Sequence, residues 1–140
     1  RVRDNISMPL ATGEREFTRF DFQSLLDHQA MDIAQPDIAR AGGFTEIRRI
    51  AEMAELYGVQ VVPHGWKTGI TAACGRHFQA ACPAAPLFEH LSPELFDSPL
   101  RRELVTPEPK IEKGQMGLPE APGLGVELDP AAVEKYLIRD

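Results

Sequence analysis

The chain has 140 residues, 43% of them hydrophobic, with a formal net charge of −6 and a pI of about 5.2. This length fits one ordinary domain with a packed core. No dense Lys/Arg cluster indicates a nucleic-acid partner, and no apolar run approaches the about 18 residues typical of a membrane-spanning helix. The chain opens at Arg1 without an initiating Met or an apolar signal core, so we expect the protein to continue upstream.

The two cysteines, Cys74 and Cys82, lie in an Ala-rich apolar stretch. Neither a CxxC motif nor a Cys/His cluster accompanies them, which disfavours a disulfide or a metal-binding pair. The sequence therefore predicts two buried free thiols. Reduced thiols are typical of the cytoplasm, where we expect the protein to reside.

Three short apolar runs predict β-strands. Residues 6–13 form a run closed by Gly13 that suits a buried strand, and Pro9 disfavours a central antiparallel one. Residues 31–35 and 59–62 are the other two runs, and each is followed by a proline. The last is rich in β-branched residues without alternation, which is typical of parallel strands covered on both faces.

Helical patterns alternate with these runs. Apolar spacing of i, i+3 and i+4 predicts a helix over about 18–28, with Thr18 as its N-cap. The clearest helix is predicted to be capped by Thr45 and to end at Gly58. A third, Ala-rich helix is predicted over about 70–81.

This succession of strand–loop–helix units predicts an α/β fold with a parallel sheet, either a barrel or a doubly wound sheet. Three strands close neither architecture, and a full (β/α)₈ barrel needs about 250 residues. We therefore predict the last three units of a TIM-type (β/α) barrel over residues 1–92 and a Pro/Gly-rich tail over 93–140. Within the tail we expect a helical turn or two in 93–104 and a final helix over about 130–136, capped by Asp129.

Each predicted strand is followed by an ionisable residue: Glu14, Asp37 and His64. In a barrel these positions share the C-terminal rim, where active sites form. A carboxylate there can bind Mg²⁺, and an Asp beside a His orients the imidazole as a general acid or base. The pattern predicts a metal-assisted proton-transfer site, an arrangement that the enolase superfamily also exemplifies.

Five motifs, in chain order, resemble the mandelate racemase branch of the enolase superfamily. They are Ala11-Thr12-Gly13-Glu14, Gln35-Pro36-Asp37, Arg40-Ala41-Gly42-Gly43, Pro63-His64 and Pro122-Gly123-Leu124-Gly125-Val126-Glu127. The intervals of 23 and 27 residues between the three ionisable positions also resemble that family. The resemblance implies the last three barrel strands and a tail that returns toward a capping domain.

The resemblance also implies roles. Glu14 matches a Mg²⁺ ligand, the third of the family's set, and Asp37 with His64 matches its acid–base dyad. Glu89 follows Leu87-Phe88, where the last barrel strand should end, and matches a carboxyl group that hydrogen-bonds the substrate carboxylate. Arg40 takes the place of a basic residue near the metal carboxylates.

Other features of the family's site have no match in this chain. Two earlier metal ligands, a lysine motif and the capping domain are missing, so the resemblance implies that an upstream part of the protein supplies them. Trp66 and Lys67 follow the dyad histidine, either as contacts to the substrate or as packing and rim charge. A homo-oligomer is a further expectation from the resemblance.

The function implied is removal of the proton α to a sugar-acid carboxylate, with dehydration to a 2-keto-3-deoxy sugar acid favoured. A lactone cycloisomerase or a racemase/epimerase would use the same residues. A non-catalytic fragment or scaffold domain remains a second class of hypothesis. Each site residue also has a plain structural alternative, such as a turn for Asp37 or a surface acid for Glu89. Structural or exposed positions are expected for the remaining histidines, His28, His77 and His90.

Overall fold

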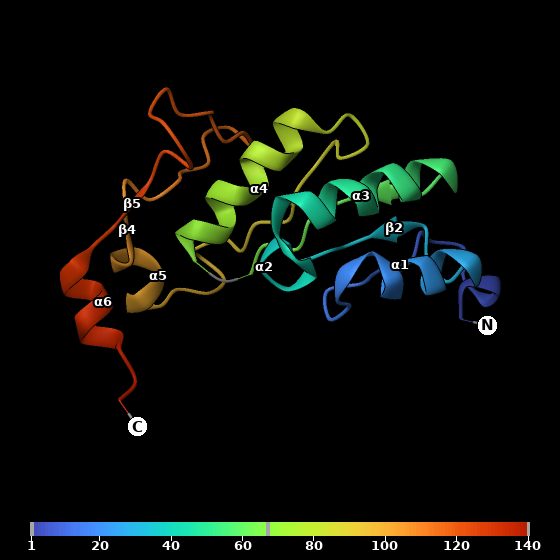
Figure 1. The fold of residues 1–140 in the computed structure, drawn as a ribbon, viewed down its shortest axis with the longest axis horizontal. Coiled ribbons are helices and arrows are strands. Elements are labelled where there is room, and N and C mark those ends of the chain that lie inside the picture. The colour runs from blue at the N-terminus through green and yellow to red at the C-terminus, as the bar shows by residue number, and fades with distance from the viewer. Residues whose placement is uncertain (1, 67, 140) are drawn as a thin grey trace.

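A computed structural model describes residues 2–66 and 68–139 and contains a three-stranded parallel sheet. Its strands are β1 (Ala11–Thr12), β2 (Ile33–Ala34) and β3 (Gln60–Val61), in the order β1-β2-β3 (Figure 1). Parallel strands need crossover helices, and the helices between these strands provide them. The predicted α/β fold with a parallel sheet is confirmed.

The register of β2 and β3 continues beyond the strands to the candidate site. Ile33 pairs with Gln60 and Ala34 with Val61, and the same offset then pairs Asp37 with His64 in an isolated parallel bridge. Pro36 and Pro63, which directly precede these two residues, interrupt regular strand pairing without shifting the register. The interval between the two ionisable residues therefore places them side by side at the carboxyl edge of the sheet.

The longer helices follow the strands in turn: α1 (Thr18–Asp27), α3 (Gly43–Leu56) and α4 (Gly69–Ala81). A short helix that the sequence did not predict, α2 (Ile38–Ala41), lies between β2 and α3. In Figure 1, α1 and α3 run side by side along the sheet, and α4 continues the layer. Their apolar faces and the strands share one core: Phe22, Leu26, Met31, Ala34, Ile38, Ala41, Ile47, Ile50, Ala51, Ala54, Val61, Phe78 and Ala85.

Two predicted helix caps are wrong. Thr18 is the first residue of α1 rather than its cap, and the Asp21 side chain instead accepts a hydrogen bond from Phe17 N at 2.8 Å. α3 begins at Gly43, two residues before Thr45, because Gly42 adopts φ +111° and turns the chain directly from α2 into α3. A left-handed backbone of this kind favours glycine.

The first predicted strand is shorter and more exposed than expected. Only Ala11 and Thr12 of the run 6–13 form β1, and both are exposed, whereas Ala34 of β2 and Val61 of β3 are fully buried. β1 is an edge strand of this sheet, and no strand in the described part of the chain pairs with its outer side. The prediction of a buried strand is therefore wrong for this chain.

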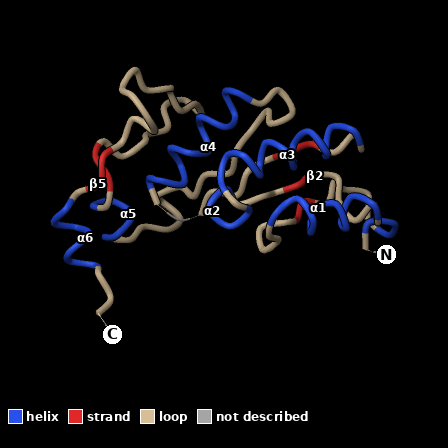
Figure 2. The backbone as a smooth tube through the Cα atoms, viewed as in Figure 1, coloured by secondary structure: helices blue, strands red, loops and turns tan. Residues whose placement is uncertain are grey.

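The tail contains α5 (Pro99–Glu103), β4 (Val105–Thr106), β5 (Glu127–Leu128) and α6 (Pro130–Tyr136). The two strands form an antiparallel pair and are connected by one long loop, and another long loop leads from α4 to α5 (Figure 2). The helical turn in 93–104 and the final helix are confirmed. Asp129 caps α6 as predicted, since its side chain accepts hydrogen bonds from Ala131 N and Ala132 N at 2.8 and 3.0 Å.

A buried arginine on α4 holds the tail loop against this helix. Arg76 donates to the carbonyl oxygens of Gly117 and Leu124 at 3.3 and 2.8 Å. His77 Nε2 also lies 3.3 Å from the Leu124 carbonyl oxygen, in agreement with a structural role. The tail loop is thus joined to the helix that directly follows the candidate site.

Both cysteines are free, as predicted, but half-buried rather than fully buried. Burial raises the pKa of the Cys74 thiol. Among the described residues, no helix has both the length and the apolar character needed to cross a membrane.

Candidate active site

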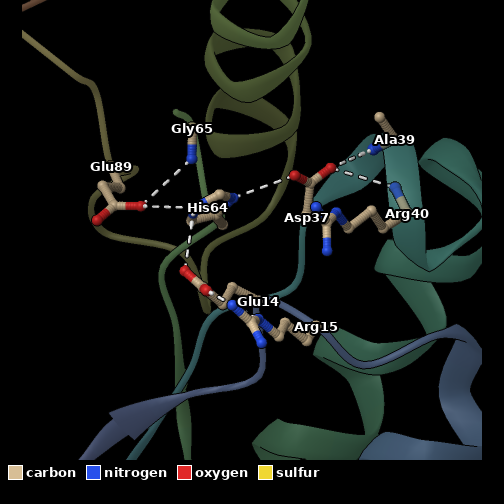
Figure 3. A network of polar contacts seen from close by, with 8 residues as sticks. All are labelled: Glu14, Arg15, Asp37, Ala39, Arg40, His64, Gly65 and Glu89. Atoms are coloured by element: carbon tan, nitrogen blue, oxygen red, sulfur yellow. Dashed lines mark hydrogen bonds and ion pairs between the residues drawn. The ribbon is translucent and has the colours of Figure 1, made fainter. Parts of the chain in front are cut away.

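Three carboxyl groups surround the imidazole of His64 at the carboxyl edge of the sheet (Figure 3). His64 Nδ1 lies 3.1 Å from Asp37 Oδ2. On the other side of the ring, Nε2 lies 3.2 Å from Glu14 Oε2 and 3.7 Å from Glu89 Oε2. The structure therefore brings together the four residues for which catalytic or metal-binding roles were predicted, although they come from four separate segments.

Asp37 is held by both of its carboxyl oxygens. It is fully buried and caps α2, with Oδ1 accepting hydrogen bonds from Ala39 N at 2.9 Å and Arg40 N at 3.2 Å. The other oxygen faces His64. Asp37 was predicted either as a turn residue or as part of a dyad. Its side chain has the geometry of both, because one oxygen binds backbone N–H groups and the other faces His64.

The contact with Asp37 defines the orientation of the imidazole. A carboxylate only accepts hydrogen bonds, so the contact with the buried Asp37 favours a ring that is protonated at His64 Nδ1 and donates a hydrogen bond to Asp37. This leaves Nε2 as the atom that faces Glu14 and Glu89 and that can take up or release a proton. Such a ring, with one nitrogen held by a buried carboxyl group and the other facing two further carboxyl groups, is suited to general acid–base chemistry.

Glu89 reaches the site from a segment that runs beside β3. The backbone donates from Glu89 N to Pro63 O at 2.9 Å and from Val61 N to Ala84 O at 3.1 Å. No strand is formed at 87–88, so the predicted last strand is wrong, although these hydrogen bonds place the segment where such a strand would lie.

Gly65 allows the Glu89 segment to approach the site closely. A Cβ atom at Gly65 would lie 1.9 Å from the Glu89 carbonyl oxygen, which no side chain can tolerate. Gly65 N also donates to Glu89 Oε2 at 3.4 Å. Gly65 therefore positions the Glu89 carboxyl group in two ways: it leaves room for the Glu89 backbone, and its N–H binds the Glu89 side chain. The sequence did not reveal this role.

Glu14 provides one ligand of a type that suits Mg²⁺. Its carboxyl group is half-exposed at the end of β1, with Oε1 3.7 Å from Arg15 Nε. Among the described residues, no group of three or more His, Cys, Asp and Glu side chains is arranged to hold a metal ion. A carboxylate oxygen is the type of ligand that Mg²⁺ favours, and Glu14 would hold such an ion together with further oxygen ligands.

The remaining residues predicted to lie near the substrate are Trp66, Arg40 and Lys67. The Trp66 ring stacks beside the His64 ring at a centroid distance of 6.2 Å and is 52% exposed, so it borders the open side of the site. Arg40 is exposed on α2, and its backbone N–H is part of the Asp37 cap. Lys67 lies outside the described residues.

The sequence missed the environment of His90, which is next to Glu89. Its Nε2 lies 3.2 Å from Nη2 of the buried Arg101 on α5. Burial, and secondarily the charge of Arg101, lower the pKa of His90 from its usual 6.5. Ser98-Pro99 signals the start of α5, but nothing in the sequence shows which of its two arginines turns inward.

Comparison with known proteins gives consistent results. The family model described as enolase C-terminal domain-like matches residues 1–132. The chain is 35% identical to a D-galactarolactone cycloisomerase from Agrobacterium fabrum, over all of the chain and 38% of that protein. It is also 35% identical to a D-xylonate dehydratase from Haloferax volcanii, over 98% of the chain and 32% of that protein.

A solved structure extends this likeness to the fold. The mandelate racemase/muconate lactonizing enzyme from Jannaschia sp. CCS1 is 33% identical and superposes with a TM-score of 0.86, over 99% of the chain and 34% of that protein. The chain thus spans about a third of the length of these relatives. The chain belongs to the enolase C-terminal domain-like family, within the mandelate racemase-type branch of the enolase superfamily.

Proposed function

We propose that the protein containing this chain is a Mg²⁺-dependent enzyme that removes the proton α to the carboxylate of a sugar acid. The favoured outcome is dehydration to a 2-keto-3-deoxy sugar acid. The observation that carries this proposal is the His64 ring, with Nδ1 held by Asp37 and Nε2 directed toward Glu14 at the carboxyl edge of the sheet.

The proposed roles of the dyad follow from its geometry. With Nε2 unprotonated, His64 accepts a proton from the carbon next to the carboxylate. With Nε2 protonated, it donates a proton to the 3-hydroxyl group, which then leaves as water. The resulting enol tautomerises to the 2-keto acid. Asp37 keeps the Nδ1 proton in place in both cases, so that only Nε2 exchanges protons with the substrate.

The other two carboxyl groups act on the substrate carboxylate and the metal. Glu14 would be a Mg²⁺ ligand, and the bound ion would stabilise the negative charge that develops on the carboxylate oxygens. Glu89, when protonated, would donate a hydrogen bond to one of these oxygens, since its Oε2 lies on the same side of His64 as Glu14. Trp66 and Lys67 are proposed to border the sugar chain, with Arg40 in a supporting position.

The upstream part of the protein completes this site in our proposal. It supplies the remaining metal ligands and a lysine base, and residues 93–140 contact both the barrel and a capping domain. The substrate is a small acid sugar. We further propose a cytoplasmic homo-oligomer.

Lactone cycloisomerisation is the second candidate function. It is favoured by the 35% identity to the D-galactarolactone cycloisomerase, which equals the identity to the D-xylonate dehydratase. Both reactions can begin with proton transfer at the carbon next to a carboxyl group, so the same dyad serves either. The fate of the intermediate separates them.

The test uses the full-length protein and a library of acid sugars and their lactones. Each substrate is incubated with Mg²⁺ or with EDTA, and products are detected as 2-keto-3-deoxy acids and by NMR. A Mg²⁺-dependent keto product supports dehydration, whereas a new lactone or an epimer moves the assignment to cycloisomerase or racemase/epimerase. Absence of any turnover across the library would contradict the enzymatic proposal and favour a scaffold role.

A further inference from the structure

Arg101 is a buried cation next to the Glu89 segment. It lies on α5, is only 4% exposed, and donates from Nη1 to the Phe96 carbonyl oxygen at 3.3 Å. Its Nε lies 3.5 Å from Glu108 Oε1, and its Nη2 lies 3.2 Å from His90 Nε2. A buried guanidinium with three separate partners is held in one orientation, which makes it a firm anchor for His90.

This contact defines the protonation of the His90 ring. A guanidinium has donors and no acceptor, so His90 Nε2 must accept from Arg101 and the neutral ring carries its proton on Nδ1. Because burial and the Arg101 charge lower the pKa of His90, the ring is neutral at neutral pH. His90 Nδ1 is buried without a hydrogen-bond partner among the described residues, so the ring is held through Nε2.

The position of the His90 ring is linked to that of Glu89. The Phe88 and His90 rings contact each other edge to face at a centroid distance of 6.4 Å, so these side chains share one side of the segment. Glu89 projects to the other side, where its Oε2 lies 3.7 Å from His64 Nε2. Successive side chains of an extended chain alternate in this way, so rotation of the segment at His90 would turn Glu89 away from the site.

We propose that Arg101 is a positioning residue, which holds the His90 ring and thereby keeps the Glu89 carboxyl group directed at the substrate site beside His64. This inference rests on the proposed function, in which Glu89 contacts the substrate carboxylate. It adds a residue from the tail, distant in sequence from the strand-end positions, to the residues that determine turnover.

The first test compares Arg101→Gln with Arg102→Gln in the full-length protein. Arg102 is the adjacent residue of α5, but its side chain is 54% exposed and pairs with Asp97. We expect Arg101→Gln to lower kcat by about 10- to 100-fold, the scale of a displaced catalytic group, with KM changed by less than about threefold. Arg102→Gln should retain the wild-type kcat.

A second pair of variants separates positioning from folding. Gln at position 90 can accept a hydrogen bond from Arg101 through its side-chain oxygen, whereas Ala cannot. His90→Gln should therefore retain more of the wild-type kcat than His90→Ala at equal thermal stability. Equal kcat losses in these two variants, or an Arg101→Gln variant as active as Arg102→Gln, would overturn the inference. If Arg101→Gln does not fold, the His90 pair decides.

The protonation of His90 gives a readout independent of activity. Long-range proton–nitrogen NMR of histidine-labelled protein, assigned with His90→Gln, should show the proton on Nδ1 in the wild type and loss of this single tautomer in Arg101→Gln. A proton on Nε2 in the wild type would overturn the inference. An inactive wild-type protein would reject the proposed function, and with it the positioning role, even if the tautomer is as expected. An active wild type with an unaffected Arg101→Gln variant would reject the positioning role alone.

Discussion

The orientation of the His64 imidazole is defined, because its two ring nitrogens face different partners. Nδ1 is held by the buried Asp37, and Nε2 faces the half-exposed Glu14. Removal of the ring should abolish proton transfer at Nε2 without disturbing the core, since His64 is not among the core residues.

We therefore predict that His64→Asn in the full-length protein lowers kcat by about 10²- to 10⁴-fold, the usual contribution of a general acid or base. Turnover and exchange of the substrate α-proton with deuterated water provide the measurements. His28→Asn is the matched control, because His28 is an exposed residue bonded to the Ser24 carbonyl oxygen. A His64→Asn variant with near-normal turnover would contradict the assigned role.

Asp37 combines two roles that substitution can separate. Asn is as good a helix N-cap as Asp, so Asp37→Asn should preserve the cap of α2, whereas Asp37→Ala should lower the free energy of unfolding by about 1 kcal/mol. In Asp37→Asn the single amide oxygen is used by the cap and the amide nitrogen, a donor, faces His64; in Asp37→Ala no acceptor is left. Both variants should therefore lose the acceptor for His64 Nδ1 and most of the turnover. Urea unfolding and steady-state kinetics of the two variants test this. If Asp37→Asn retains full activity, the residue is only a cap.

The sequence identified the residues at the strand ends but not those that hold them. Glu14, Asp37 and His64 each follow a strand, which suffices to predict that they meet. Contacts of Gly65 and Arg101 depend on how distant segments pack, and no local pattern encodes them.

The loop that follows β3 is packed closely against another segment of the chain. The close approach of the Glu89 carbonyl oxygen to Gly65 links this loop to the segment that carries Glu89. Any side chain at position 65 must displace one of the two.

We predict that Gly65→Ala lowers the free energy of unfolding by about 1–3 kcal/mol, the usual range for overpacking, and lowers kcat as well. Gly117→Ala is the control, because a Cβ atom there would meet no atom within 4 Å. Urea unfolding of both variants should show the difference. Equal stability of the two would mean that the loop can move away from the Glu89 segment without cost.

Helix positions were predictable from periodicity, while the caps of α1 and α3 were not. The apolar spacing located α1 and α4 to within about one residue at each end, and the start of α3 to within three residues. The start of α3 depends on the left-handed Gly42, which links α2 directly to α3. The cap of α6 was predicted because Asp129-Pro130 is a strong local start signal.

At the scale of the whole molecule, the chain has more surface than a compact protein of its size. Its accessible surface is 9072 Å², compared with about 7200 Å² expected for a monomer of 15.5 kDa. The excess is larger than the about 800 Å² that one partner contributes to a standard protein interface. Part of this surface is therefore suited to contact with other segments of the protein.

We accordingly predict that residues 1–140 expressed alone bind an apolar dye and self-associate, whereas the full-length protein does neither to a similar extent. Dye fluorescence and light scattering at matched concentrations test this. A monomeric, dye-free isolated chain would show that it is complete as a folded unit.

Stability should also depend on pH through His90. Its pKa is lowered in the folded state, so the unfolded chain binds a proton more readily below its usual 6.5. The stability that His90 contributes is present above that pH and is lost as the pH falls toward the folded-state pKa. The free energy of unfolding of the wild type minus that of His90→Gln should therefore decrease as the pH is lowered from about 7 to about 5.

The contact between Arg76 and the tail has a consequence for protein engineering. A chain shortened to end before Gly117 would remove both carbonyl oxygens that Arg76 binds, and would leave a charged group on α4 in an apolar setting. Chimaeras between relatives should therefore exchange α4 together with residues 117–125 as one block. A crossover point between them would combine an arginine from one parent with a loop shaped for another.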